Sequence, residues 1–270
     1  IIGCIGSCEV TRASLSGCRA VAVGPRRSRP AGGARATIPL MFQRTELPAG
    51  PRVISARLQG SRSVAVAAYV LAGSRLESPA EAGVAHFMEP LTFKGTARYP
   101  SSRAISEAVE GVGGSANAAT DRESTVYWAR VPRREAPRAI DVLGELVVRP
   151  RLTDADIDHE RTVIVEEIRS YLDDPAEYCQ MLIQTAVFGD GPLGREICGD
   201  EAGIRALPAA AIHDFWGALY RPSNTVVAVA GDLEHDEVVG LVAGAFGSGD
   251  GIVPAAPAAP VLPAGPRVLT

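Results

Sequence analysis

The chain lacks the features that mark several large classes of protein. It has no run of about eighteen apolar residues, so we expect no transmembrane helix and no membrane partner. Its arginines do not cluster in the part predicted to fold, and the net charge is only −4, which excludes a nucleic-acid groove. Its five cysteines form no disulfide framework, so we expect reduced thiols and a cytoplasmic location.

Histidine is also scarce, with four in 270 residues, and one is missing where a metal site would need it. Residues 83–96 read GVAHFMEPLTFKGT. On a helix, His86 and position 90 lie about 40° apart around the axis, so histidines at both positions could bind one metal ion. Glu89 would act as general base on a metal-bound water. Position 90 is proline, so the zinc-peptidase pattern H-x-x-E-H lacks its last ligand.

Pro90 is expected to affect this helix in two ways. It removes an imidazole, and its ring presses on the carbonyl of His86, four residues earlier, at a cost of about 3 kcal/mol. We therefore expect weak or absent zinc binding and a displaced His86 side chain.

A further ligand is expected from a second helix, predicted over residues 153–172. Thr153 and Asp156 are typical of a helix start. Glu160 and Glu167 are seven residues apart, two helical turns, so both carboxylates lie on one face. Because an unpaired charge on a largely apolar face is costly, these carboxylates need a partner, and a metal ion is one such partner.

These residues belong to an ordered series of motifs that resembles the insulinase family, which includes pitrilysin and mitochondrial processing peptidase. The resemblance runs from about residue 41 to the end of the chain. Its further motifs are Gly73-Ser74-Arg75, Phe93-Lys94-Gly95-Thr96, Gly113-Gly114, Asn117-Ala118-Ala119-Thr120, Asp173-Asp174-Pro175, Pro192-Leu193-Gly194, Tyr220-Arg221-Pro222 and Gly231-Asp232. It implies the N-terminal half of a zinc metallopeptidase in which two similar halves close like a clamshell over the peptide.

The resemblance also implies roles for individual residues. His86 and Glu167 would bind zinc, Glu89 would be the catalytic base, and Glu160 would steady the site. The second histidine ligand has no counterpart at Pro90.

Substrate binding is expected at the segment that contains Asn117 and Ala118. Its small side chains would let an extended peptide add as a strand, with main-chain hydrogen bonds supplying affinity. The alternative is a simple hairpin edge. The partners implied are a peptide or unfolded protein substrate and a second homologous half or chain.

Two functions remain open. The first is a zinc-dependent metalloendopeptidase domain with a defective metal site. The second is a non-catalytic peptide-binding or partner subunit of a two-chain peptidase.

Three explanations of Pro90 compete: loss of catalysis, a single-base change or sequence error in an active enzyme, and rescue by another ligand. The retention of Glu89 and Glu167 favours a recent or artefactual loss, since nothing would preserve them in a long-inactive subunit.

Composition divides the chain into three parts. Residues 1–40 are rich in arginine and poor in acidic residues, which indicates a leader or upstream segment outside the fold. A mitochondrial presequence, with a location in the matrix, is the alternative. Residues 41–252 form the peptidase-like domain. Residues 253–270 carry proline at every third position, which predicts an extended linker toward a missing second half.

The domain is predicted to be α+β, with helices packed against a largely antiparallel sheet. Strands are expected over 53–58, 63–71 and 225–230, with a long strand or hairpin over 115–131. Beyond the two helices above, further helices are expected over 101–112, 135–148, 177–188, 208–219 and 235–246.

Overall fold

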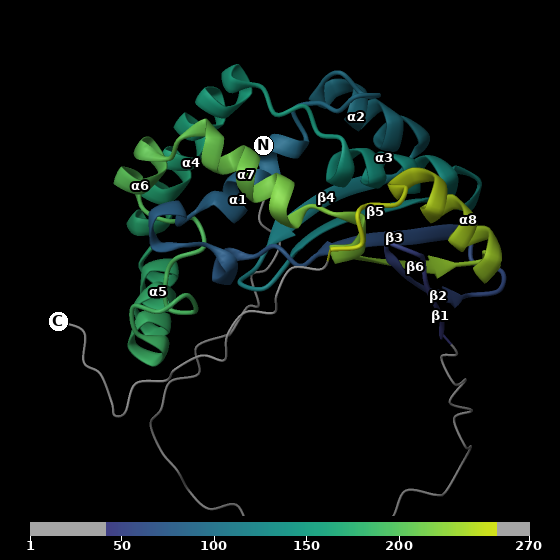
Figure 1. The fold of residues 1–270 in the computed structure, drawn as a ribbon, viewed down its shortest axis with the longest axis horizontal. Helices are drawn as coiled ribbons and strands as arrows, with labels where there is room; N and C mark the ends of the chain where they lie inside the picture. Colours follow the sequence, from purple (N-terminus) through teal and green to yellow (C-terminus); the bar gives the residue numbers. More distant parts are fainter. Residues whose placement is uncertain (1–41, 253–270) are drawn as a thin grey trace, which may run out of the picture. The chain divides into compact units, whose positions relative to one another are not determined.

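The computed structural model describes residues 42–252, which contain one six-stranded sheet with helices on one face and at one end (Figure 1). The strand order is β1-β2-β6-β3-β5-β4, and every neighbouring pair is antiparallel except β2 with β6. The strands are β1 (Phe42–Glu46), β2 (Arg52–Arg57), β3 (Ser63–Val70), β4 (Ser115–Thr120), β5 (Thr125–Pro132) and β6 (Thr225–Gly231). The predicted α+β class is confirmed. The predicted leader and linker lie outside the described residues.

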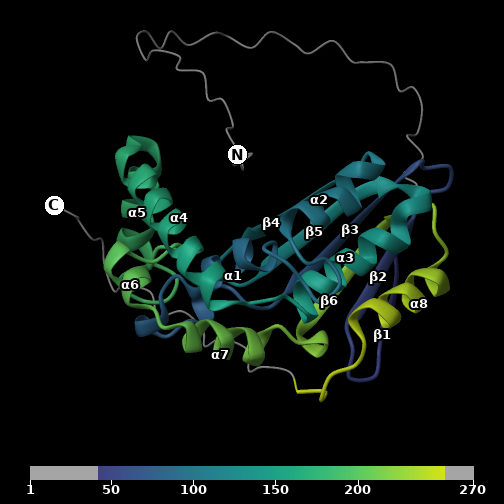
Figure 2. The same ribbon diagram turned by 90° about the horizontal axis from the view of Figure 1, so that it is seen from above.

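Helices occupy two regions around the sheet (Figures 1 and 2). Helices α2, α3 and α8 cover one face, whereas α1 and α4 to α7 gather at one end. Their bounds are α1 (Val84–Thr92), α2 (Ser102–Val109), α3 (Ala136–Val148), α4 (Asp154–Asp173), α5 (Pro175–Phe188), α6 (Glu201–Ala206), α7 (Ala209–Leu219) and α8 (His235–Phe246). Among the described residues, no helix combines the length and apolarity needed to cross a membrane.

The two faces of the sheet differ in burial because side chains alternate along each strand. On β3, Val64, Val66, Ala68 and Val70 are buried beneath the helices. On β5, the other face carries Val126, Trp128 and Arg130, which are partly or fully exposed. One face of the sheet therefore forms the core, and the other face has no helical layer.

Helix α5 contributes no residue to the core. None of its residues is buried, although its composition is largely apolar. Tyr178, Leu182, Ile183 and Val187 are its large exposed apolar residues. The predicted helix over 177–188 is confirmed, and it presents apolar surface rather than a core face.

Candidate metal centre

Helix α1 turns the chemically active residues of its motif away from the core. Its apolar side chains, Val84, Ala85, Phe87, Met88 and Leu91, are fully buried. His86, Glu89 and Pro90 are all partly exposed. The apolar residues therefore fix the helix against the core, and the motif residues remain accessible.

The start of α1 is held by a buried carboxylate that the motif alone does not indicate. Glu77 is 5% exposed, and its two oxygens accept hydrogen bonds from the backbone N–H groups of Gly83 (3.0 Å) and Ala85 (2.8 Å). These are N–H groups that the first turn of a helix cannot satisfy internally. Burial raises the pKa of Glu77 to about 7, because it penalises the charged form more than these hydrogen bonds favour it.

The raised pKa of Glu77 predicts a pH-dependent stability. A carboxyl group whose pKa rises from 4.5 to about 7 on folding stabilises the fold below pH 4.5, and this contribution is lost as pH rises to about 7. The expected loss is about 3 kcal/mol of unfolding free energy. Between pH 4.5 and 7, the free energy of unfolding measured with denaturant should fall more steeply with pH for the natural chain than for Glu77→Gln. Parallel curves would contradict the expectation.

His86 and Glu167, which the family resemblance implies as zinc ligands, meet between α1 and α4. The His86 Nε2 atom lies 3.2 Å from Glu167 Oε2. Burial would lower the pKa of His86, but the neighbouring Cys198 and Glu167 side chains outweigh it and raise this pKa well above its usual value. A proton on His86 competes with a metal ion, because a histidine ligand must be neutral.

Glu89 lies at the end of the edge strand β4. The Thr120 Oγ1 hydroxyl, in the last residue of β4, donates a hydrogen bond to Glu89 Oε2 at 2.7 Å. In the sequence these residues are 31 positions apart, and no local pattern joins them. The expected base and the expected peptide-binding segment are therefore in direct contact.

Pro90 lies inside α1, which continues for two further residues to Thr92. The expected displacement of His86 is not seen, since its imidazole still reaches Glu167. The consequence of Pro90 is chemical: position 90 offers neither an imidazole nor a backbone N–H.

Glu160 lies near the site but has a different partner from the one expected. Its side chain is buried and forms an ion pair with Lys94, through the Oε2 atom. This oxygen accepts no hydrogen bond of ordinary geometry from the described residues. Lys94 lies two residues beyond the end of α1 and neutralises the carboxylate, so Glu160 needs no metal ion to compensate its charge.

The ligands present do not complete a zinc site. Catalytic zinc sites normally use three protein ligands. His86 and Glu167 supply two, and among residues 42–252 no group of three or more histidine, cysteine, aspartate or glutamate side chains is arranged to hold a metal ion. The site thus does not fit a catalytic zinc ion while Pro90 is present.

Comparison with known families shows to which family the chain belongs. The model of the Insulinase (Peptidase family M16) domain matches residues 52–201, which is more than half of the chain. The chain belongs to the insulinase family. A second family model, described as the Peptidase M16 inactive domain, matches residues 206–268.

Relatives within the insulinase family are named as proteases. An uncharacterized zinc protease of Mycobacterium leprae is 40% identical over 205 residues, covering 76% of this chain and 46% of the relative. A probable mitochondrial-processing peptidase subunit beta of Arabidopsis thaliana is 34% identical over 195 residues, covering 72% of this chain and 36% of the relative. The chain thus spans half or less of the length of these curated relatives.

Solved structures agree with this assignment. A mutant of the ferredoxin protease FusC, in complex with Arabidopsis ferredoxin, matches with a TM-score of 0.72 at 26% identity, over 80% of this chain and 25% of that chain. Family membership supports a peptidase-type function and zinc as the metal of the family.

Proposed function

We propose that this chain is the metal-site half of a zinc metalloendopeptidase whose ligand set lacks one histidine. With Pro90 in place, it binds extended peptides without cleaving them. The observation that carries this proposal is the joint placement of His86, Glu167 and Glu89 at the end of edge strand β4. A histidine and two carboxylates placed together at a partly exposed site are the residue types that a metal-dependent hydrolase uses.

Peptide binding follows from the position of β4. This strand is last in the sheet order, so its outer edge has no strand partner among the described residues. The Ala118 N–H donates a hydrogen bond to its neighbour Asn117 Oδ1 at 2.9 Å. An added peptide would bond to the backbone along this edge and extend the sheet. Its path leads to Thr120 and Glu89.

The alternative proposal is a non-catalytic peptide-binding or partner subunit. It is favoured by Pro90 itself, which leaves two ligands where three are needed. The two proposals share the peptide site on β4, including Asn117 and Ala118. They differ in whether the metal site was recently functional.

Partner and location also remain proposals. We propose a second homologous half or chain as partner, because the curated relatives are about twice as long as the matched region. A protein or peptide substrate is supported by the similarity to the ferredoxin protease, whose solved structure is a complex with ferredoxin. The free thiols of Cys179 and Cys198 favour a reducing compartment, either the cytoplasm or the mitochondrial matrix.

Zinc content and peptide cleavage test the function of the natural chain directly. Under metal-limited conditions, elemental analysis should find almost no zinc, because two ligands bind zinc much more weakly than three. Peptide cleavage by the natural chain should not exceed that by a Glu89→Gln variant, which retains the fold but lacks the base. Cleavage that disappears in Glu89→Gln would mean that another group completes the site, and would overturn the proposed defect.

A further inference from the structure

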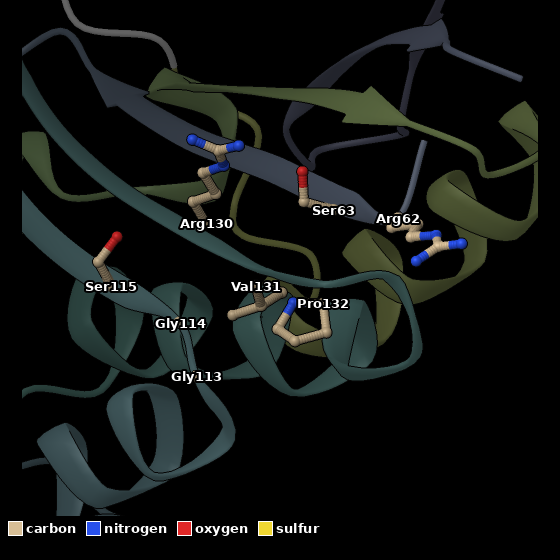
Figure 3. Close-up of a pocket in the computed structure, with 8 residues that line it drawn as sticks. All are labelled: Arg62, Ser63, Gly113, Gly114, Ser115, Arg130, Val131 and Pro132. Carbon is tan, nitrogen blue, oxygen red and sulfur yellow. The ribbon is translucent and has the colours of Figure 1, made fainter. Parts of the chain in front are cut away.

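A cavity of about 600 Å³ lies at the end of β4 that is farthest from Glu89 (Figure 3). None of the residues that line it is acidic, and two are arginines. Figure 3 shows Arg130 and Arg62 on opposite sides of Ser63, with Gly113 and Gly114 on the adjoining segment. The cavity is therefore positively charged in a chain whose net charge is −4.

Both arginines are available for a ligand. Their side chains are exposed, and neither forms an ion pair or side-chain hydrogen bond with any other residue of the described range 42–252. By contrast, Arg57 and Arg133 near the same end of the sheet are bonded to Asp232. Unpaired guanidinium groups beside a cavity are suited to bind carboxylates, which they can contact through two parallel hydrogen bonds.

The backbone at Gly114 packs closely against β5, beside the cavity. A side chain there would collide with the Arg130 carbonyl and the Val131 side chain, since a Cβ atom would lie 2.7 Å from each. Gly113 has φ of +82°, a conformation that favours glycine, and a Cβ atom there would meet nothing within 4 Å. The open space therefore lies at Gly113, whereas Gly114 lets this segment approach β5 closely beside Arg130.

The sheet register connects this cavity to the proposed peptide path. Ser115 is paired with Arg130, whereas Thr120, five residues along β4, contacts Glu89. At about 3.4 Å per residue, a peptide along the edge would cover about 17 Å between these two points. The cavity therefore lies within reach of a peptide whose reacting bond is at Glu89.

Side-chain direction favours a contact between that peptide and Arg130. Directly paired residues project to the same face, so Ser115 and Arg130 share the open face of the sheet. A peptide residue opposite Ser115 would project to this face too. It would lie about 10 Å from β5, two strand spacings away. The small Ser115 side chain lets the long Arg130 side chain cross that distance.

We propose that this cavity is a carboxylate-binding subsite for peptides that add to β4. The carboxylate belongs to an acidic side chain, or to the C terminus of the peptide, five residues from the position that lies against Thr120. Two residues nearer to Thr120, the peptide side chain would lie over Asn117 and Trp128, which are paired. An apolar residue is preferred there. This inference rests on the proposed peptide binding along β4.

Fluorescence anisotropy with labelled peptides tests the subsite without requiring a metal. A set of otherwise identical peptides would carry one glutamate, moved position by position, with glutamine analogues as references. We expect the peptide with glutamate at one particular position to bind about three- to tenfold more tightly than its glutamine analogue. Charge-assisted hydrogen bonds in a partly exposed site contribute about this much to affinity. Peptides with free and amidated C termini distinguish a terminal carboxylate from a side chain.

Charge reversal provides the matched control. Arg130→Glu should abolish the glutamate preference, whereas Arg103→Glu should preserve it. Arg103 is an exposed arginine on α2 that pairs with Glu107 and does not line the cavity. Both variants change the net charge equally, so equal losses would assign the preference to general electrostatics and overturn the subsite.

The outcomes also separate the subsite from the proposed function. If glutamine peptides bind and neither glutamate nor a free C terminus improves binding, the subsite is wrong and the β4 peptide site stands. If no peptide binds, both are wrong.

Discussion

Replacing Pro90 with histidine is expected to raise the zinc content of the purified chain from near zero to about one ion per chain. His86 and Glu167 already lie 3.2 Å apart, and α1 keeps its course through position 90. An imidazole at that position lies one turn beyond His86 on the same helical face. The ligand set would then have the three members that catalytic zinc sites use.

Two controls separate the ligand from the helix. Pro90→Ala restores the backbone N–H and removes the ring without adding a ligand, so it should stay free of zinc. Pro90→His combined with Glu167→Gln should lose most of the gained zinc, because it has two histidines and no carboxylate ligand. An empty Pro90→His variant that is correctly folded would contradict a zinc-peptidase origin for these residues.

Gly83→Ala is expected to lower the free energy of unfolding by about 3–5 kcal/mol. Gly83 has φ of 96°, which side chains rarely adopt, and it is the residue from which α1 begins. An added Cβ would lie 2.6 Å from Ile204 Cδ1 and 2.7 Å from the Cys198 carbonyl oxygen. The change would therefore strain the backbone and push α1 away from the segment around Cys198.

Denaturant unfolding with a matched glycine variant would measure this effect. Gly240 lies inside α8, where a Cβ meets nothing within 4 Å. Gly240→Ala should therefore be neutral or stabilising by up to about 1 kcal/mol. If Gly83→Ala lowers the free energy of unfolding by less than about 1 kcal/mol, the contact with Cys198 is not rigid.

The sequence predicted the interior of the fold better than its margins. Residues 53–58 and 63–71 were expected as strands, and β2 and β3 confirm them within one residue at each end. The hairpin over 115–131 is confirmed as β4 and β5. Strand β1 was not predicted, because most of its residues are exposed and its position depends on pairing with β2. The six-residue helix α6 is too short to show a periodic pattern.

The residues of the candidate site were also predicted only in part from the sequence. His86 and Glu89 could be named from the helix motif, and Glu167 from the resemblance to the insulinase family, because helical spacing alone offered Glu160 and Glu167 equally. Glu77 and the contact of Thr120 with Glu89 could not be predicted, since both reach α1 through hydrogen bonds between segments that are distant in sequence or irregular in shape. Glu160 was placed correctly on α4, but its ion pair with Lys94 was not foreseen. Lys94 stands two residues beyond α1, where helical periodicity no longer predicts direction.

Lys94 is also the only lysine in the 270-residue sequence. The chain consequently has a single side-chain amine, and it is held against a buried carboxylate close to the candidate metal centre. Reagents that acylate amines, cross-linkers of the same chemistry and supports that couple through lysine have one side chain to act on. Attachment there would disrupt the ion pair beside the centre, whereas thiol chemistry at the exposed Cys179 acts on a different helix, α5.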